Sequence, residues 1–92
     1  MAEQFTSITN CTNHGLQQLL ARGFTPQEVT DLLHKPHAIK MQSDGCKVFI
    51  RTIQGKSNYV ILNQAGEIVT ALKELNAKSM MNLQSNYGWV PC

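Results

Sequence analysis

The first third of the chain contains apolar residues spaced three or four positions apart, as on one side of a helix. They are Leu16, Leu19, Leu20 and Phe24. Thr12 or Asn13 can cap the start of this helix. Gly23 is a plausible stop, because glycine adopts the left-handed conformation at low cost. The pattern predicts a first helix from Asn13 to just before Gly23.

A second helix is indicated by a stronger start signal. Thr25, Pro26 and Glu28 place a hydroxyl at the N-cap, proline at the first helical position and a carboxylate at the third, which is a capping box. Its apolar face follows in the residues Val29, Leu32 and Leu33. Pro36 ends the pattern, because proline cannot continue a helix interior.

After Pro36 the apolar residues follow the two-residue period of strands. Strands are predicted over 38–42, 46–53, 59–63 and 67–72. The turn residues Ser43-Asp44-Gly45 and Gln64-Ala65-Gly66 connect them closely, which favours an antiparallel meander.

The remaining segment predicts a helix over residues 74–84 and an aromatic tail from Tyr87 to Pro91. This order predicts an α+β fold. Two N-terminal helices pack on a four-stranded antiparallel β-meander, followed by a short C-terminal helix, and the helices are expected on one face of the sheet.

Composition fits a single folded unit. The chain has 92 residues, 42% of them hydrophobic, a net charge of +2 and only three prolines, which excludes a disordered chain. We expect a flexible tail over residues 1–11 and one domain over 12–92. The sequence shows neither a membrane-spanning stretch nor a signal peptide.

The cysteines predict neither a disulfide framework nor a zinc site. Cys11, Cys46 and Cys92 are odd in number and widely spaced, and no C-x-x-C pair is present. His34 and His37 have only two residues between them and do not match the usual zinc spacing. We therefore expect no metal and no cofactor.

Positive charge is concentrated in the middle of the chain. Five basic residues, against Asp44 alone, occur there: Lys35, Lys40, Lys47, Arg51 and Lys56. On a meander they can form a positive surface of the kind that binds an RNA backbone. The alternative is a solvated sheet edge, where lysines prevent pairing with other strands.

One polar row stands out on the first helix. His14, Gln18 and Arg22 are spaced four residues apart and therefore share a face. An imidazole can move a proton near neutral pH, and a guanidinium can hold a phosphate through two hydrogen bonds. The alternative is an exposed histidine without a function.

Four further residues are candidates with structural alternatives. Thr70 lies in an otherwise apolar strand, where its hydroxyl can bind a phosphate oxygen or be structural. Arg51 alternates outward from its strand, as a surface charge or an anion clamp. Tyr87 and Trp89 can stack on nucleobases or cover the end of the sheet.

The order of these motifs resembles a known group of proteins. His14, Arg22 with Gly23-Phe24-Thr25, the Tyr59–Thr70 segment and Asn86-Tyr87-Gly88-Trp89 are similar to C-terminal toxin domains of contact-dependent growth inhibition and other polymorphic toxin systems. That group includes ribonucleases of the barnase/EndoU/colicin/RelE-like fold. The resemblance covers roughly residues 12–90.

The resemblance implies a metal-independent ribonuclease that often cuts tRNA and is blocked by a cognate immunity protein. The residues that match the family's site are His14, Arg22 and Thr70. Gln18 stands where the family commonly has arginine, and Lys47 or Arg51 is a candidate to compensate. A family member would be delivered as the C-terminal part of a secreted or surface effector, and would act in the target-cell cytoplasm as a monomer or as a 1:1 complex with its immunity protein.

As an enzyme, the protein would promote attack of an RNA 2′-hydroxyl on the adjacent phosphate and leave a 2′,3′-cyclic phosphate.

Three alternative functions remain open at the level of sequence. One is a RelE-like toxin of a toxin–antitoxin pair that cuts ribosome-bound mRNA. Another is a non-catalytic module that binds RNA or protein. The third is an immunity-type or structural protein, which the excess of basic residues disfavours.

Overall fold

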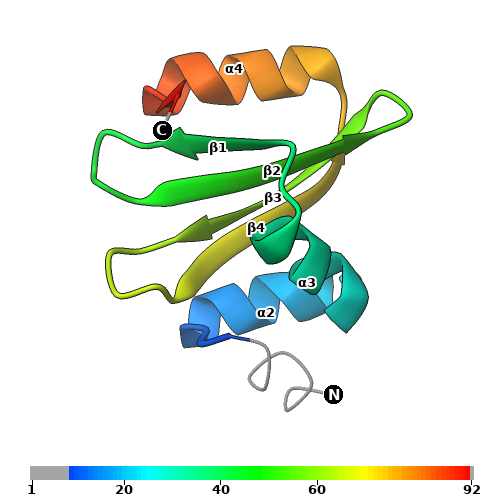
Figure 1. The fold of residues 1–92 in the computed structure, drawn as a ribbon, viewed down its shortest axis with the longest axis vertical. Coiled ribbons are helices and arrows are strands. Elements are labelled where there is room, and N and C mark those ends of the chain that lie inside the picture. The colour runs from blue at the N-terminus through cyan, green and yellow to red at the C-terminus, as the bar shows by residue number, and fades with distance from the viewer. Residues whose placement is uncertain (1–8, 92) are drawn as a thin grey trace.

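The computed structural model describes residues 9–91 and shows an α+β fold (Figure 1). Within these residues, three helices accompany one five-stranded antiparallel sheet with the strand order β4-β3-β2-β1-β5. The helices are α2 (Asn13–Ala21), α3 (Pro26–His34) and α4 (Ala77–Tyr87). The strands are β1 (Ala38–Met41), β2 (Lys47–Ile53), β3 (Lys56–Leu62), β4 (Ile68–Leu75) and β5 (Val90–Pro91). The predicted fold class is confirmed.

The two N-terminal helices begin where their capping signals predict. The Thr12 side chain accepts a hydrogen bond from the backbone N–H of Gly15 at 3.0 Å and caps α2. In α3, Thr25 and Glu28 form both hydrogen bonds of the capping box, at 3.1 and 2.8 Å. These boundaries are set by local side chain–backbone contacts, and so the sequence alone predicts them.

The C-terminal helix is displaced from its predicted range of 74–84. Strand β4 continues to Leu75, and the side chain of Asn76 then caps α4 by accepting from the N–H of Ser79 at 2.8 Å. The helix ends at Gly88, which has the left-handed conformation with a φ of 64°. Asn76 is thus the start signal that the apolar pattern did not reveal.

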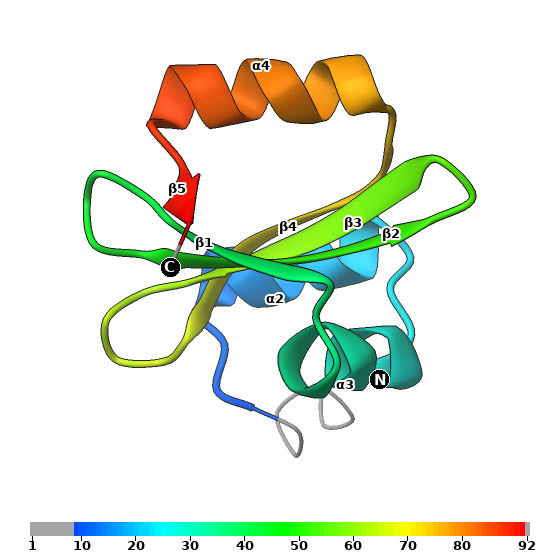
Figure 2. The same cartoon turned by 45° about the horizontal axis from the view of Figure 1, so that its top comes forward.

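The sheet is covered on both faces, which corrects the prediction that the helices share one face. In Figure 2 the sheet lies between α4 on one side and α2 with α3 on the other. Val60 of β3 belongs to the core under α2 and α3, whereas its neighbours Tyr59 and Ile61 belong to the core under α4. A strand that is apolar at consecutive positions buries both of its sides, and each side needs a cover.

The aromatic tail adds a fifth strand that the prediction of four strands missed. Val90 and Pro91 pair with Met41 and Lys40 of β1. The preceding Trp89 is 6% exposed and meets the ring of Tyr59 edge-on, with the ring centroids 5.3 Å apart. This buried indole fixes the end of the chain against the sheet.

Helix α2 approaches strand β4 more closely than any side chain at position 15 would allow. The backbone N–H and the hydroxyl of Thr12 both donate to the carbonyl of Ile68, at 3.0 and 3.2 Å. A Cβ atom added to Gly15 would lie 1.9 Å from that same oxygen. Glycine is therefore required at this position for steric reasons.

The segment before α2 is also bonded to β4, so the expected tail over 1–11 is too long. The N–H of Ile68 donates to the carbonyl of Asn10 at 2.9 Å, and Cys11 forms a parallel bridge with Ile68. Residues 1–8 of the expected tail lie outside the described residues, as does Cys92.

Lys73 of β4 connects the sheet to the turn between α2 and α3. Its ammonium group lies 2.9 Å from the Glu28 carboxylate, donates to the carbonyl of Gly23 at 3.0 Å and lies 5.5 Å from the centre of the Phe24 ring. These contacts hold the two helices in one orientation against β4.

We expect Gly15→Ala to destabilise the protein. In an ordinary helix this change stabilises by about 0.5–1 kcal/mol, but here the methyl group would overlap the Ile68 carbonyl, at a cost of roughly 1–3 kcal/mol. Urea denaturation measures the difference. Gln17→Ala on the exposed side of α2 is the matched control and should change the stability by less than about 0.5 kcal/mol. A Gly15→Ala protein as stable as its parent would contradict the close contact.

Glu28→Gln should lower stability in a pH-dependent way. Burial alone would raise the pKa of Glu28, but hydrogen bonds from Lys73 and Thr25 outweigh it and hold the pKa below its usual value. Glutamine can still complete the capping box, so the variant loses the charge that faces Lys73. For these partly exposed groups the loss at pH 7 should be below about 1 kcal/mol.

The sign of this effect is fixed by the lowered pKa. The carboxylate stabilises the fold at neutral pH, and that contribution disappears as the pH falls through the pKa of the folded state. Denaturation of both proteins across acidic pH measures it. A stability difference that grew toward low pH would contradict the assignment.

Candidate active site

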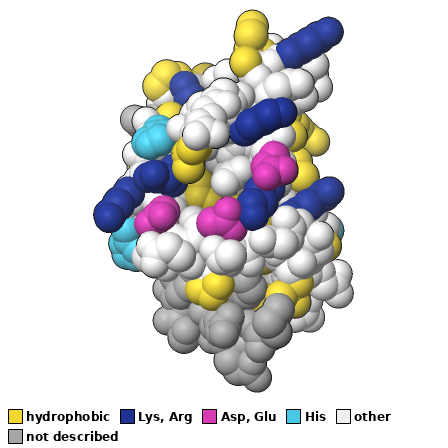
Figure 3. Space-filling view, turned by 90° about the vertical axis from the view of Figure 1, so that its right-hand side faces the viewer, with side chains coloured by type: hydrophobic (Ala, Val, Ile, Leu, Met, Phe, Trp, Pro, Cys, Tyr) yellow, Lys and Arg dark blue, Asp and Glu magenta, His cyan; other side chains and the backbone are white. Residues whose placement is uncertain are grey.

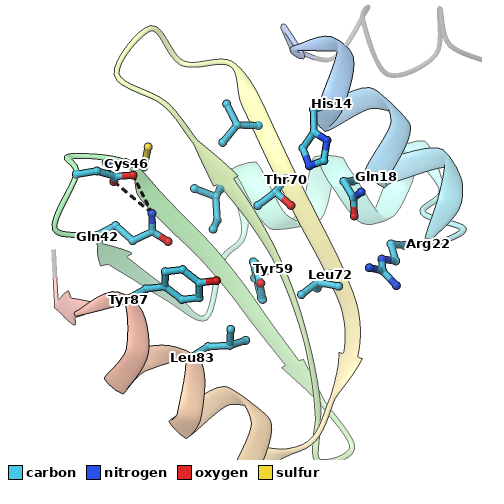
Figure 4. Close-up of a pocket in the computed structure, with 13 residues that line it drawn as sticks. His14, Gln18, Arg22, Gln42, Cys46, Tyr59, Thr70, Leu72, Leu83 and Tyr87 are labelled. Atoms are coloured by element: carbon cyan, nitrogen blue, oxygen red, sulfur yellow. Dashed lines mark hydrogen bonds between the residues drawn. The ribbon is translucent and has the colours of Figure 1, made fainter.

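A groove of about 360 Å³ opens where α2, β4 and α4 come together (Figure 4). Its polar lining consists of His14, Gln18, Arg22, Gln42, Asp44, Cys46, Tyr59, Thr70 and Tyr87. Three other hollows on the described surface have similar volumes of about 360 to 400 Å³. Size therefore does not identify a site, and the chemistry of the lining has to decide.

One wall of the groove is the predicted polar row of α2. His14, Gln18 and Arg22 follow one another along the helix and point toward the sheet side of the groove in Figure 4. The adjoining face of α2 is fixed by the buried Leu19 and by the contact of Gly15 with β4. Because that face is held against the edge strand, the polar row next to it borders the groove.

Thr70 faces the groove because β4 contains a bulge. Leu62 pairs with Ile68 and Ile61 pairs with Thr70, so Val69 is an extra residue in β4. Regular alternation would have placed Thr70 on the side of Ile68, which is buried under α2 and α3. The bulge moves Thr70 to the face of Ile61, and Figure 4 shows its hydroxyl directed toward Gln18.

Two tyrosines contribute hydroxyl groups to the centre of the groove and to its α4 side. Tyr59 lies on β3 with a buried ring, and Tyr87 lies at the end of α4 and is 53% exposed. Burial first, and the neighbouring Tyr87 second, raise the pKa of Tyr59 to about 12, although Arg22 acts in the opposite direction. The Tyr59 hydroxyl is therefore neutral and a hydrogen-bond donor at physiological pH.

The wall opposite α2 is held by a chain of hydrogen bonds. The indole N–H of Trp89 donates to the Oε1 atom of Gln42 at 2.9 Å, and the Gln42 amide donates to the Asp44 carboxylate at 3.2 Å. The backbone N–H of Cys46 and the Gln42 side chain hold the pKa of Asp44 below its usual value. Burial and Asp44 raise the pKa of the Cys46 thiol, so this thiol is a poor nucleophile at neutral pH.

The structure brings together five of the eight residues predicted from the sequence. His14, Gln18, Arg22, Thr70 and Tyr87 all line the groove. Trp89 does not, because its ring belongs to the core and its N–H is bonded to Gln42. Trp89 therefore covers the end of the sheet and is not placed to stack on a nucleobase.

Lys47 and Arg51 do not compensate for Gln18 in this structure. Val48 and Ile50 of β2 face α4, so alternation directs Lys47 and Arg51 to the opposite face. Lys47 lines another hollow there, and the Arg51 guanidinium donates to the backbone carbonyl of Lys35.

The basic residues of the central segment do not form one positive surface. Lys47, Lys40 and Lys56 line three separate hollows. On the face shown in Figure 3, lysine and arginine side chains are separated by acidic and uncharged ones. The groove itself contains the guanidinium of Arg22 and the carboxylate of Asp44. It therefore lacks the strong positive charge that the sequence predicted.

The sequence did not reveal four polar residues of the groove: Gln42, Asp44, Cys46 and Tyr59. Asp44 appeared as a turn residue and Tyr59 as part of an apolar strand. Their position depends on contacts between distant segments, such as the one between Trp89 and Gln42, which are 47 residues apart. No local pattern carries that information.

Within residues 9–91, no three His, Cys, Asp or Glu side chains gather as they would around a metal ion. No helix in this part of the chain has the length and apolarity needed to cross a bilayer. In comparisons with known proteins, no family model, no curated protein and no solved structure matches this chain.

Proposed function

We propose that the protein is a metal-independent toxin ribonuclease whose active site is the groove between α2, β4 and α4. One observation carries this proposal: the imidazole of His14, the guanidinium of Arg22 and the hydroxyl of Thr70 line one accessible groove. These three residues come from positions far apart in the sequence. They are also the three that match the motifs of the toxin family.

In the proposed reaction, neutral His14 takes the proton of an RNA 2′-hydroxyl, whose oxygen attacks the adjacent phosphorus. The bond from phosphorus to the 5′-oxygen then breaks. The leaving 5′-oxygen takes a proton from water, and the resulting hydroxide takes the proton held by His14, so the products are a 2′,3′-cyclic phosphate, a 5′-hydroxyl end and a regenerated His14. No water is consumed in this step.

The remaining groups of the groove stabilise charge on the phosphate. Arg22 can donate two hydrogen bonds to phosphate oxygens, and the Thr70 hydroxyl can donate one. Gln18 lies between His14 and Arg22 along α2 and contributes a neutral amide donor. Tyr87, exposed on the opposite rim, offers an aromatic face on which a base can stack.

The biological part of the proposal follows from the resemblance of the motifs. The substrate would be tRNA in the cytoplasm of a target cell, and a cognate immunity protein would neutralise the toxin. The chain would then be the C-terminal part of a larger effector. A RelE-like toxin acting on ribosome-bound mRNA would use the same chemistry, and the identity of the cleaved RNA distinguishes the two.

A second candidate function, a non-catalytic binding module, is favoured by a separate observation. Lys40, Lys47 and Lys56 lie outside the groove, and the groove contains an acidic residue, Asp44, as well as Arg22. A protein that binds RNA through scattered lysines, without cleaving it, would show this distribution. It would retain RNA binding after the loss of His14 and would leave tRNA intact.

His14→Gln should reduce cleavage of tRNA by about 10²–10⁴-fold, because the general base is lost while a polar side chain remains. His34→Gln, at the exposed end of α3, is the matched control and should cleave at the parental rate. Denaturing gels of purified tRNA, with analysis of the fragment ends, measure both. Equal activity of the His14 variant and its parent would remove the assignment.

Thr70→Val tests the role of the Thr70 hydroxyl. Valine has nearly the same shape as threonine and keeps the strand, so only the hydroxyl is lost. We expect cleavage to fall by roughly 10-fold or more, consistent with the loss of one hydrogen bond of about 1–2 kcal/mol in the transition state. Thr30→Val on α3, which removes a hydroxyl bonded to the Pro26 carbonyl, controls for effects on folding. If both variants kept parental activity, Thr70 would be structural.

A further inference from the structure

Tyr59 presents a hydroxyl to the groove without a hydrogen-bond partner among the described residues. The residue is only 3% exposed, and its ring is held edge-on against Trp89 in the core under α4. Tyr59 nevertheless lines the groove. A phenylalanine would pack the same core, whereas the hydroxyl of a buried tyrosine usually has a partner. No described residue supplies that partner, and because the hydroxyl is not among the fully buried polar atoms, a ligand in the groove can supply it.

The sheet places Tyr59 beside Thr70. Tyr59 pairs with Leu72 and Ile61 pairs with Thr70, so Tyr59 and Thr70 are diagonal neighbours on one face of two adjacent strands. Diagonal neighbours lie about 7–8 Å apart, and both residues line the groove, so one ligand there can contact both side chains. Arg22 lies near enough to Tyr59 to influence its charge state.

The electrostatics favour a donor role over a role as a base. Burial raises the pKa of Tyr59 to about 12, so the phenol keeps its proton throughout the neutral range. The groove has little net positive charge, since Asp44 offsets Arg22 and Gln18 is neutral. Stabilisation of a phosphate that gains negative charge must then depend on neutral donors.

We propose that Tyr59 is a catalytic residue whose hydroxyl donates a hydrogen bond to a non-bridging oxygen of the scissile phosphate. It acts together with Thr70 and Arg22, and it supplies part of the stabilisation that a second arginine at position 18 would otherwise provide. This inference rests on the proposed ribonuclease function. Tyr59 transfers no proton and forms no bond in the step.

Tyr59→Phe tests the inference, because it removes the hydroxyl and keeps the ring against Trp89. We expect kcat for tRNA cleavage to fall by about 10²–10³-fold with KM nearly unchanged, as for the loss of one donor to developing charge. The melting temperature should stay close to that of the parent. Ser85→Ala, an exposed hydroxyl on α4 outside the groove, is the control and should retain parental kinetics.

The outcomes separate this inference from the proposed function. If the parent cleaves tRNA and Tyr59→Phe cleaves within about threefold of it, the role of Tyr59 is overturned and the ribonuclease remains. A rise in KM with unchanged kcat also overturns it, since the hydroxyl would then bind the ground state equally well. A parent protein that does not cleave any RNA overturns both proposals.

Discussion

The close contact between α2 and β4 is the constraint on which the site depends. The carbonyl of Ile68 accepts two hydrogen bonds from Thr12, and Gly15 leaves room for the helix to lie directly against it. This contact fixes both the distance and the rotation of α2. The rotation directs His14, Gln18 and Arg22 past the edge of the sheet, and the distance brings them to the groove that Thr70 lines. A larger residue at position 15 would move the whole row.

The groove is formed because the sheet is covered on both faces. Helix α4 and Trp89 close one face while α2 and α3 close the other, and the groove lies at the edge where the two layers meet (Figures 2 and 4). The buried Trp89 orients Gln42 and through it Asp44, so the wall opposite His14 is held by the core itself. The same core holds the ring of Tyr59. Functional groups in the groove are therefore positioned by packing rather than by flexible loops.

Local features of the fold could be predicted from the sequence, and long-range ones could not. The capping box at Thr25 and the row from His14 to Arg22 depend on spacing within one helix, and both are found as predicted. The bulge at Val69 depends on how β4 pairs with β3, and the fifth strand depends on where the tail meets β1. A cluster of basic residues in the sequence also gives no continuous surface: Lys40 pairs with Val48 and shares its face, whereas Lys47 and Arg51 lie on the opposite face of the sheet.

We propose that RNA binds in the groove and not on the face that carries Lys47 and Arg51. The most direct test is a nuclear magnetic resonance titration of the protein with a single-stranded deoxyoligonucleotide, which has no 2′-hydroxyl and cannot be cleaved. Resonances of His14, Thr70 and Tyr87 should shift together and saturate at one affinity, because all three residues line the groove. Shifts confined to Lys47, Arg51 and their neighbours, with the groove unaffected, would contradict it.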